Sequence, residues 1–112
     1  MKKTNKDTQT EFSKKVLELI KAIPKGKVAT YGLIAGLAGN RQGARGVGWL
    51  LHSCAQSHNL PWQRVIKSNG QLSFPLLSNT YSLQKNLLES EGVTVLNGRV
   101  DLKEYLWEFN TK

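Results

Sequence analysis

Residues 30–54, TYGLIAGLAGNRQGARGVGWLLHSC, contain two short helical patterns joined by a glycine-containing turn. Thr30 can cap the first helix, which we expect to run from Tyr31 to about Ala38 before Gly39-Asn40 breaks it. The second helix is expected from about Gln42 to Cys54. Two such helices at a tight turn are typical of a helix-turn-helix, whose second helix is presented to DNA. The inward side chains are predicted to be those of Leu33, Ile34, Leu37, Val47, Leu50 and Leu51.

The second helix has an unusual composition, because Gly43, Ala44, Gly46 and Gly48 surround Arg45. Glycine inside a helix costs about 1 kcal/mol relative to alanine, so its repeated use needs a reason. A major-groove reader would carry several Arg, Asn or Gln side chains. A nearly bare face with one long cation suits the narrow minor groove, with Arg45 as an inserted probe. The alternative, which the sequence leaves open, is a glycine-lined helix that packs tightly on another helix.

The overall charge favours a polyanionic partner. The chain of 112 residues has 16 Lys and Arg against 8 Asp and Glu, for a formal net charge of +8. Hydrophobic residues make up 39%, so the chain can fold as one domain and not comfortably as two. This balance favours nucleic acid as the partner over a basic protein that has none.

Cysteine usage and the absence of long apolar runs indicate the compartment. Cys54 is the single cysteine, so no disulfide can form within the chain, which fits a reducing compartment. Cys54, His52 and His58 lack the spacing of a metal site, and no cofactor is expected. Residues 1–10 do not resemble a signal peptide, and no apolar run approaches membrane-spanning length. We therefore expect a protein without membrane contact that is cytoplasmic or, in a eukaryote, nuclear. We also expect the free protein to be a monomer.

The N-terminal region is predicted to contain a tail and one helix. Residues 1–9 are expected to form a flexible basic tail, and residues 10–112 the folded domain. Thr8 and Glu11 have the spacing of a capping box, and Pro24 ends the helix that follows. The apolar face of this helix is predicted on Phe12, Val16, Leu19, Ile20 and Ile23.

A proline-tryptophan segment follows the helix-turn-helix. Pro61 should make the chain enter this segment in an extended conformation. The flat ring of Trp62, held on a rigid loop, is a stacking surface as much as a core side chain. The stretches from Arg64 to Lys67 and from Gln71 to Phe74 flank Ser68-Asn69-Gly70, which predicts a hairpin, the wing.

The remainder is predicted to contain two helices and a turn. Thr80 should cap a helix that Gly92 closes, and Asp101 should cap a last short helix. Short strands are expected at Val93-Thr94-Val95 and Arg99-Val100, about the Asn97-Gly98 turn. The predicted fold is mainly α, a single winged helix-turn-helix domain with a small β wing. The inward side chains are predicted to be Leu83, Leu87 and Leu88, then Leu102, Tyr105, Leu106 and Phe109.

Three segments, in order, carry a resemblance to a known family. They are Val28-Ala29-Thr30-Tyr31-Gly32, then Gly43-Ala44-Arg45-Gly46-Val47-Gly48, then Pro61-Trp62-Gln63-Arg64-Val65-Ile66. Together with Gly70 and Leu87-Leu88-Glu89-Ser90-Glu91-Gly92, they resemble the DNA-binding domain of the O6-alkylguanine-DNA alkyltransferases. The resemblance implies a fold like the C-terminal domain of those enzymes.

One departure indicates the subfamily. The transferases carry Pro-Cys-His-Arg-Val, whose cysteine accepts the alkyl group, whereas Trp62 and Gln63 occupy the cysteine and histidine positions here. Tryptophan at that position is the mark of the alkyltransferase-like proteins. An indole offers no nucleophile comparable to a thiolate, and Gln63 cannot act as a base. Glu91 occupies the family's glutamate position and is expected to be stranded without its histidine partner.

The resemblance implies a non-catalytic protein that binds O6-alkylguanine in duplex DNA and marks it for nucleotide excision repair proteins. Tyr31 would press on a backbone phosphate and Arg45 would enter the base stack, so that the nucleotide flips out. The pocket for the flipped base is expected from Pro61, Trp62, Gln63 and Val65, with backbone groups near Val65 bonding the guanine edge. Further DNA contacts are expected from Thr30, Asn40, Arg41, Gln42, Ala44, Gly46 and Lys67.

Two other functions are compatible with parts of the sequence. A winged-helix transcription regulator without lesion preference would explain the charge and the helix-turn-helix, but not the glycine-rich helix or the Trp62 loop. An enzyme with Cys54 as nucleophile is disfavoured, because His52, two residues away on a helix, would point elsewhere.

Overall fold

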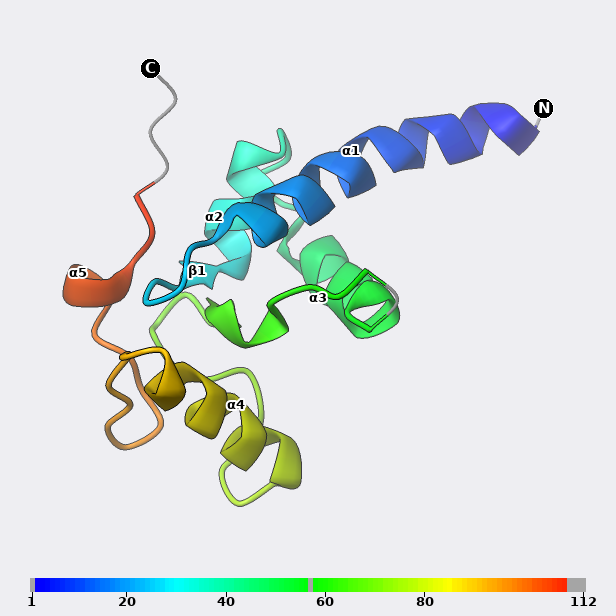
Figure 1. Ribbon diagram of the computed structural model, residues 1–112. Helices are drawn as coiled ribbons and strands as arrows, with labels where there is room; N and C mark the ends of the chain where they lie inside the picture. The colour runs from blue at the N-terminus through cyan, green and yellow to red at the C-terminus, as the bar shows by residue number, and fades with distance from the viewer. Residues whose placement is uncertain (1, 57, 109–112) are drawn as a thin grey trace.

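Three helices pack together in one half of the structure (Figure 1). The computed structural model describes residues 2–56 and 58–108. α1 covers Lys2–Ala22, α2 covers Tyr31–Leu37 and α3 covers Ala44–Cys54. α2 packs on α3, and both contact α1. The predicted helix-turn-helix is therefore confirmed.

Side-chain caps and a glycine set the geometry of this motif. Oγ1 of Thr30 accepts a hydrogen bond from the N–H of Leu33 at 3.1 Å, which caps α2 as predicted. Gly39 has a φ of +101°, a conformation that side chains with a Cβ rarely adopt. Oδ1 of Asn40 then accepts from the N–H of Gln42 at 3.0 Å and keeps Gln42 in the turn. As a result, α3 begins at Ala44 rather than at Gln42.

The first helix is longer than predicted and projects beyond the others (Figure 1). α1 already includes residues 2–9, so the predicted tail is helical there and Thr8 cannot cap the start. A folded helix extends at low cost, because adding a residue needs no new nucleation. The predicted apolar face is confirmed: Val16, Ile20 and Ile23 are buried, and Phe12 and Leu19 pack beside them.

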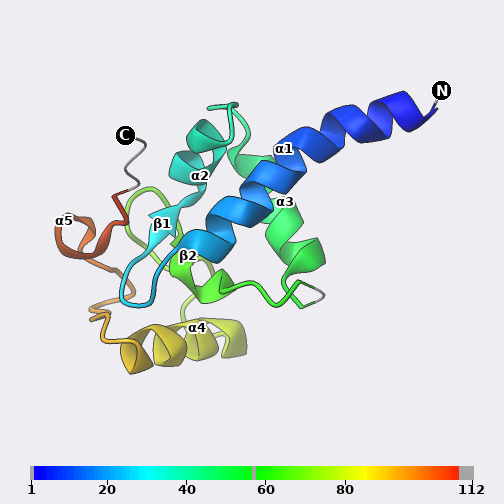
Figure 2. The same ribbon diagram turned by 45° about the horizontal axis from the view of Figure 1, so that its top comes forward.

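Two short strands lie between the helical parts (Figure 2). β1 (Ala29–Thr30) and β2 (Val65–Ile66) pair in parallel, with Ala29 opposite Val65. The predicted hairpin is wrong in its pairing, because the sheet partner of β2 is β1. Ser68-Asn69-Gly70 form a tight turn, in which the N–H of Gly70 donates to the carbonyl oxygen of Lys67 at 2.9 Å, and the N–H of Lys67 donates across the turn to the carbonyl oxygen of Gln71 at 3.0 Å. Both residues of β2 are fully buried, and a solvent-exposed wing could not bury them.

The sheet separates two hydrophobic cores. Successive strand residues point to opposite faces, so Val65 joins one core and Ile66 joins the other. The first core, against α1, α2 and α3, consists of Val16, Ile20, Ile23, Ala29, Ile34, Ala35, Ala38, Val47, Leu51, Leu60 and Val65. The second consists of Val28, Ile66, Leu72, Tyr81, Leu88, Val93, Val95 and Val100.

The fourth helix covers Asn79–Ser90, and its cap differs from the prediction. Oγ of Ser78 accepts from the N–H of Tyr81 at 3.1 Å, so Ser78 is the cap and Thr80 is not. Gly92, with a φ of +92°, follows the end of α4 as predicted.

The buried side of α4 also differs. Leu88 is buried as predicted and Leu87 is half-buried, but Leu83 is 51% exposed. Tyr81 and Gln84 are buried in its place, and the Gln84 amide finds its hydrogen-bond partners inside the protein.

The last part of the described chain forms a turn and a short helix. Asn97 and Gly98 both have positive φ and make the predicted turn, closed by a bridge between Leu96 and Arg99. Only isolated bridges form there within the described residues, not the two predicted strands. Asp101 caps α5 (Leu102–Tyr105) as predicted. Leu102, Tyr105 and Leu106 are partly buried, and Phe109 lies outside the described residues.

Candidate nucleic-acid interface

A cavity of about 420 Å³ lies between α3, the start of α2 and the segment around Trp62. Trp62 opens a single 3₁₀ turn, η1 (Trp62–Arg64), where the sequence suggested extended chain. Its indole meets the ring of Phe74 edge to face, with centroids 6.0 Å apart and planes at 79°. The cavity is therefore mostly apolar with a few polar groups, the character of a small-molecule or base pocket. It is lined by Tyr31, Gly48, Leu51, His52, Ala55, Trp62, Ser73, Phe74 and Thr80.

A chain of hydrogen bonds supports one wall of this cavity. The hydroxyl of Tyr31 donates to Oγ of Ser73 at 2.8 Å, and Oγ of Ser73 donates to the carbonyl oxygen of Val65 at 2.9 Å. Burial raises the pKa of Tyr31, and the bond to Ser73 opposes this only in part. The phenol is therefore neutral at physiological pH, with its proton directed at Ser73.

Gln84 extends this network beneath the Trp62 segment. Its side chain is fully buried on α4. Nε2 donates to the carbonyl oxygens of Gln63 and Val65 at 3.1 and 3.2 Å, and Oε1 accepts from the N–H of Ser73 at 3.1 Å. The amide of Gln84 thus fixes the positions of η1, β2 and the segment at Ser73 relative to one another.

A second polar cluster lies at the end of α4. Glu91 accepts hydrogen bonds from Nε2 of Gln63 at 2.8 Å and from Nε and Nη2 of Arg64 at 3.0 Å each. Nη1 of Arg64 also donates to the carbonyl oxygen of Ile23 at 2.7 Å, next to the end of α1. The prediction that Glu91 is stranded is therefore wrong, because Gln63 and Arg64 supply its partners.

Electrostatics keeps this carboxylate charged. Burial raises the pKa of Glu91, but the hydrogen bonds from Arg64 and Gln63 and the charge of Arg64 outweigh it. The pKa of Glu91 consequently lies below its ordinary value. The carboxylate of Glu91 is thus paired and structural, and it is not positioned to act as a general base.

Only one of the four predicted pocket residues lines the cavity. Trp62 does so, whereas Pro61 and Gln63 border a separate depression beside Lys21. Val65 is fully buried; its N–H donates to the carbonyl oxygen of Trp62, and its own carbonyl accepts from Ser73 and Gln84. The backbone of Val65 is therefore bonded within the chain when no DNA is bound, and the expected contact of nearby backbone groups with guanine stays a prediction.

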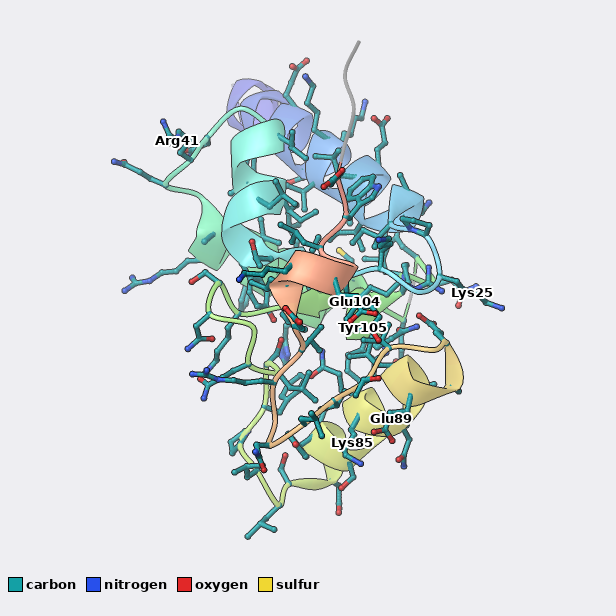
Figure 3. The ribbon with its side chains drawn as sticks, turned by 90° about the vertical axis from the view of Figure 1, so that its left-hand side faces the viewer. Lys25, Arg41, Lys85, Glu89, Glu104 and Tyr105 are labelled. Carbon is teal, nitrogen blue, oxygen red and sulfur yellow. The ribbon has the colours of Figure 1, made fainter. Side chains whose placement is uncertain are left out.

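The predicted DNA-contacting residues divide into two groups. Arg41, Gln42, Arg45 and Lys67 are exposed, and Figure 3 shows Arg41 pointing away from the body of the protein. Asn40 is exposed, although its side chain already holds the turn before α3. Ala44 and Gly46 are half-buried, and Thr30 is 8% exposed with its hydroxyl used as a cap.

Gly43, which directly precedes α3, and Gly46 within α3 face α1 rather than an open surface. A Cβ on Gly43 would lie 2.8 Å from Cζ of Phe12, and one on Gly46 would lie 3.4 Å from Cε2 of the same ring. Gly48 faces Tyr31 instead, with 3.8 Å to Cε1. The alternative that the sequence left open, close packing on another helix, therefore explains Gly43 and Gly46.

The predicted bare face of α3 is also wrong, because Trp49 on this helix is 68% exposed. Sequence reasoning further missed Ser73 and Gln84 as parts of the site, whereas the apolar Phe74-Pro75-Leu76-Leu77 loop was open to two interpretations, a receiver of bulky alkyl groups or simple packing. Gln84 could have been recognised, since it shares a helical face with Tyr81 and Leu88 at spacings of three and four residues. Ser73 gives no such signal, because its contacts depend on the fold.

The sequence matches, over residues 11–93, the family described as the 6-O-methylguanine DNA methyltransferase, DNA binding domain. The chain belongs to this family. A DNA base-flipping protein from Vibrio parahaemolyticus is 41% identical over 99 residues, which span 88% of this chain and 97% of that protein. Alkyltransferase-like protein 1 from Schizosaccharomyces pombe is 38% identical, over 88% and 95% of the two chains.

The fold agrees with this membership. The crystal structure of S. pombe Atl1 in complex with damaged DNA containing O6-carboxymethylguanine superposes with a TM-score of 0.79. It covers 88% of this chain and 96% of that chain at 38% identity. The mainly helical fold predicted from the family resemblance is thereby confirmed.

Two further observations concern the described part of the chain. Among the described helices, none combines the length and apolar content that crossing a bilayer requires. Within the same residues, His, Cys, Asp and Glu side chains form no group of three that could hold a metal ion.

Proposed function

We propose that this protein binds O6-alkylguanine in duplex DNA by flipping the nucleotide out of the base stack, without alkyl transfer. The observation that carries the proposal is the cavity lined by Trp62 and Tyr31, directly beside α3 of the helix-turn-helix. A flipped base needs a pocket with an aromatic wall and a few polar groups, and this cavity has both.

In this proposal α3 enters the minor groove and Arg45 fills the gap that the extruded nucleotide leaves. Gly48 lines the cavity one helical turn after Arg45, so the gap and the pocket lie side by side on the same helix. Tyr31 lines the cavity and, in this proposal, contacts the backbone phosphate next to the flipped nucleotide. Its proton is directed at Ser73 in the free protein, so a phosphate contact requires that this proton turn toward the DNA.

Selectivity for damage follows from two comparable energies. Flipping costs a few kcal/mol, and less for a base that is already badly paired. Stacking a base on an aromatic ring such as Trp62 contributes roughly 1–3 kcal/mol. Because these terms nearly cancel, stable extrusion favours alkylated guanine, which pairs poorly with cytosine, over normal guanine.

The residues around the pocket argue against transfer chemistry. Trp62 occupies the position where the transferases carry their acceptor cysteine, and its indole cannot take up the alkyl group as a thiolate does. Cys54 packs against the first hydrophobic core and is not among the described residues that line the cavity. Gln63 and Arg64 occupy the acceptors of Glu91.

Without transfer, the lesion stays in the DNA and other proteins have to remove it. We therefore propose nucleotide excision repair proteins as the downstream partners, from the family resemblance. A cytoplasmic setting and a monomeric free state stay predictions from the sequence.

Equilibrium binding to two matched duplexes tests the proposed function. One duplex carries O6-methylguanine and the other guanine at the same position, and both are titrated at one fixed salt concentration. We expect clearly tighter binding to the modified duplex and no mass increase of the protein afterwards. Equal affinity would contradict lesion recognition and favour the transcription regulator, and a methyl adduct on the protein would contradict the non-catalytic role.

A further inference from the structure

Trp49 is an aromatic side chain of α3 that neither the cavity nor the hydrophobic cores include. It is 68% exposed, whereas Trp62 is half-buried. Single exposed apolar residues are ordinary on protein surfaces, so exposure alone assigns nothing. The position of Trp49 on α3 is what gives it significance.

Trp49 lies on the face of α3 that carries the exposed cation. It follows Arg45 by four residues, so the two side chains are neighbours on the helix surface. On its other side, its ring centroid lies 6.2 Å from that of His52, which lines the cavity. Arg45, Trp49 and His52 therefore form one exposed strip beside the pocket mouth, which we call the α3 strip.

We propose that Trp49 is a second DNA-contacting side chain that lies against the sugars and base edges of the minor groove next to Arg45. This proposal rests on the proposed function, because it assumes that α3 faces the groove. Apolar wedges in the minor groove partly unstack base steps and keep the duplex distorted. An indole beside Arg45 would lie against the groove in a similar way, whether or not a nucleotide is flipped out.

The surroundings of Trp49 favour DNA over a protein partner. Protein-binding tryptophans lie in well-packed apolar pockets of an interface. Around Trp49, the other exposed positions of α3 are Arg45, His52 and Ser53, all polar, and Arg41 and Gln42 are exposed just before the helix. In a chain with a net charge of +8, this setting suits a polyanion whose bases offer flat faces.

The location predicts a distinctive signature. Trp49 carries no charge, so its loss should leave the salt dependence of binding unchanged. It lies outside the cavity lining, so its loss should weaken binding to modified and unmodified duplexes by the same factor. Loss of a residue that lines the cavity would instead change the ratio of the affinities for the modified and unmodified duplexes.

The test compares Trp49→Ala and Trp49→Phe with Leu96→Ala, a matched loss of an apolar side chain that is 69% exposed outside α3. Anisotropy titrations use labelled duplexes with O6-methylguanine or guanine. We expect Trp49→Ala to weaken binding to both duplexes by about five- to 150-fold, the range for one lost aromatic contact with a base. Trp49→Phe should keep most of the affinity and Leu96→Ala all of it. Unchanged affinity of Trp49→Ala, or a loss confined to the modified duplex, would overturn the proposal.

The wild-type protein separates this proposal from the proposed function. If wild type shows no lesion preference but Trp49→Ala weakens both complexes, the groove contact stands and lesion recognition fails. If wild type prefers the lesion and Trp49→Ala binds equally well, only the groove contact fails.

A second measurement avoids any change at Trp49. In the Trp62→Phe, Trp107→Phe protein, Trp49 is the remaining tryptophan. Saturating duplex DNA should then lower the acrylamide quenching constant at least two-fold, because the groove shields the ring. An unchanged quenching constant at saturation would overturn the proposal.

Discussion

At the residue scale, the candidate site combines the cavity lined by Trp62 with an ion pair between Arg64 and Glu91. Glu91 and Arg64 have side chains that are 8% and 13% exposed, and their shortest contact is 3.0 Å. Gln63 donates to the same carboxylate oxygen as Nη2 of Arg64. Since Arg64 also bonds Ile23, the cluster ties the end of α4 to the Trp62 segment and to the end of α1. Gln63 therefore has a structural role.

The ion pair predicts a pH dependence of stability. The folded-state pKa of Glu91 lies below its ordinary value of 4.5, so its stabilisation is complete above that pH. As pH falls through 4.5 toward the folded-state pKa, the unfolded chain takes up the proton first and the stabilisation is lost. Glu91→Gln should lower the free energy of unfolding by about 3 kcal/mol at pH 7, because it leaves the charge of Arg64 unpaired.

Urea unfolding at pH 7, 5, 4 and 3 measures both effects. The gap between wild type and Glu91→Gln should narrow as the pH drops below 4.5. Glu89→Gln is the matched control, since the Glu89 side chain is 41% exposed in its pair with Lys85 and should matter little. A gap that stays constant down to pH 3 would contradict the assigned role of the ion pair.

At the element scale, α4 positions the Trp62 segment through Gln84. The residues that cap and stabilise this helix therefore also affect the geometry of the site. Ser78→Ala should lower the free energy of unfolding by about 1 kcal/mol, because it removes the acceptor for the N–H of Tyr81. Thr80→Ala, two residues further on, removes no cap and should cost less than about 0.5 kcal/mol. Thermal and urea unfolding of the two variants would show the difference, and a larger loss for Thr80→Ala would contradict the observed cap.

The same helix shows where sequence reasoning stops. Ser78 and Thr80 are both good caps, and local pattern alone does not choose between them. Leucine is the more obvious core residue, so the pattern predicts that Leu83 points inward. The fold instead buries Gln84, whose partners on Gln63, Val65 and Ser73 come from distant parts of the chain.

Elements defined by local signals were predicted well. Thr30, Asp101 and Gly92 act at helix ends as expected, since a cap or a positive φ is a property of a few neighbouring residues. The pairing of β2 with β1 was missed, because parallel strands are joined by a long crossover that leaves no mark in either strand. Trp62 lines a cavity, whereas its role in a lesion pocket stays a prediction, and most other lining residues come from segments that only the fold brings together.

At the scale of the whole molecule, the net charge of +8 should make DNA binding strongly dependent on salt. Figure 3 shows Arg41 projecting from the turn before α3, while Lys85 lies on α4 beside Glu89, in another part of the protein. Arg41→Ala should therefore reduce the slope of log K against log salt concentration by about 0.9, the loss of one phosphate contact. Titrations at several salt concentrations measure the slope, with Lys85→Ala as the control. Equal slopes for wild type and Arg41→Ala would contradict a phosphate contact by Arg41.

The most direct measurement of the pocket is the fluorescence of Trp62 during DNA binding. In the Trp49→Phe, Trp107→Phe protein, Trp62 is the remaining tryptophan, and phenylalanine at position 49 should preserve most of the groove contact. A base stacked on the indole should quench it, so we predict strong quenching by the O6-methylguanine duplex and little by the matched guanine duplex. Equal quenching by both duplexes, or none by either at saturation, would contradict a lesion pocket at Trp62.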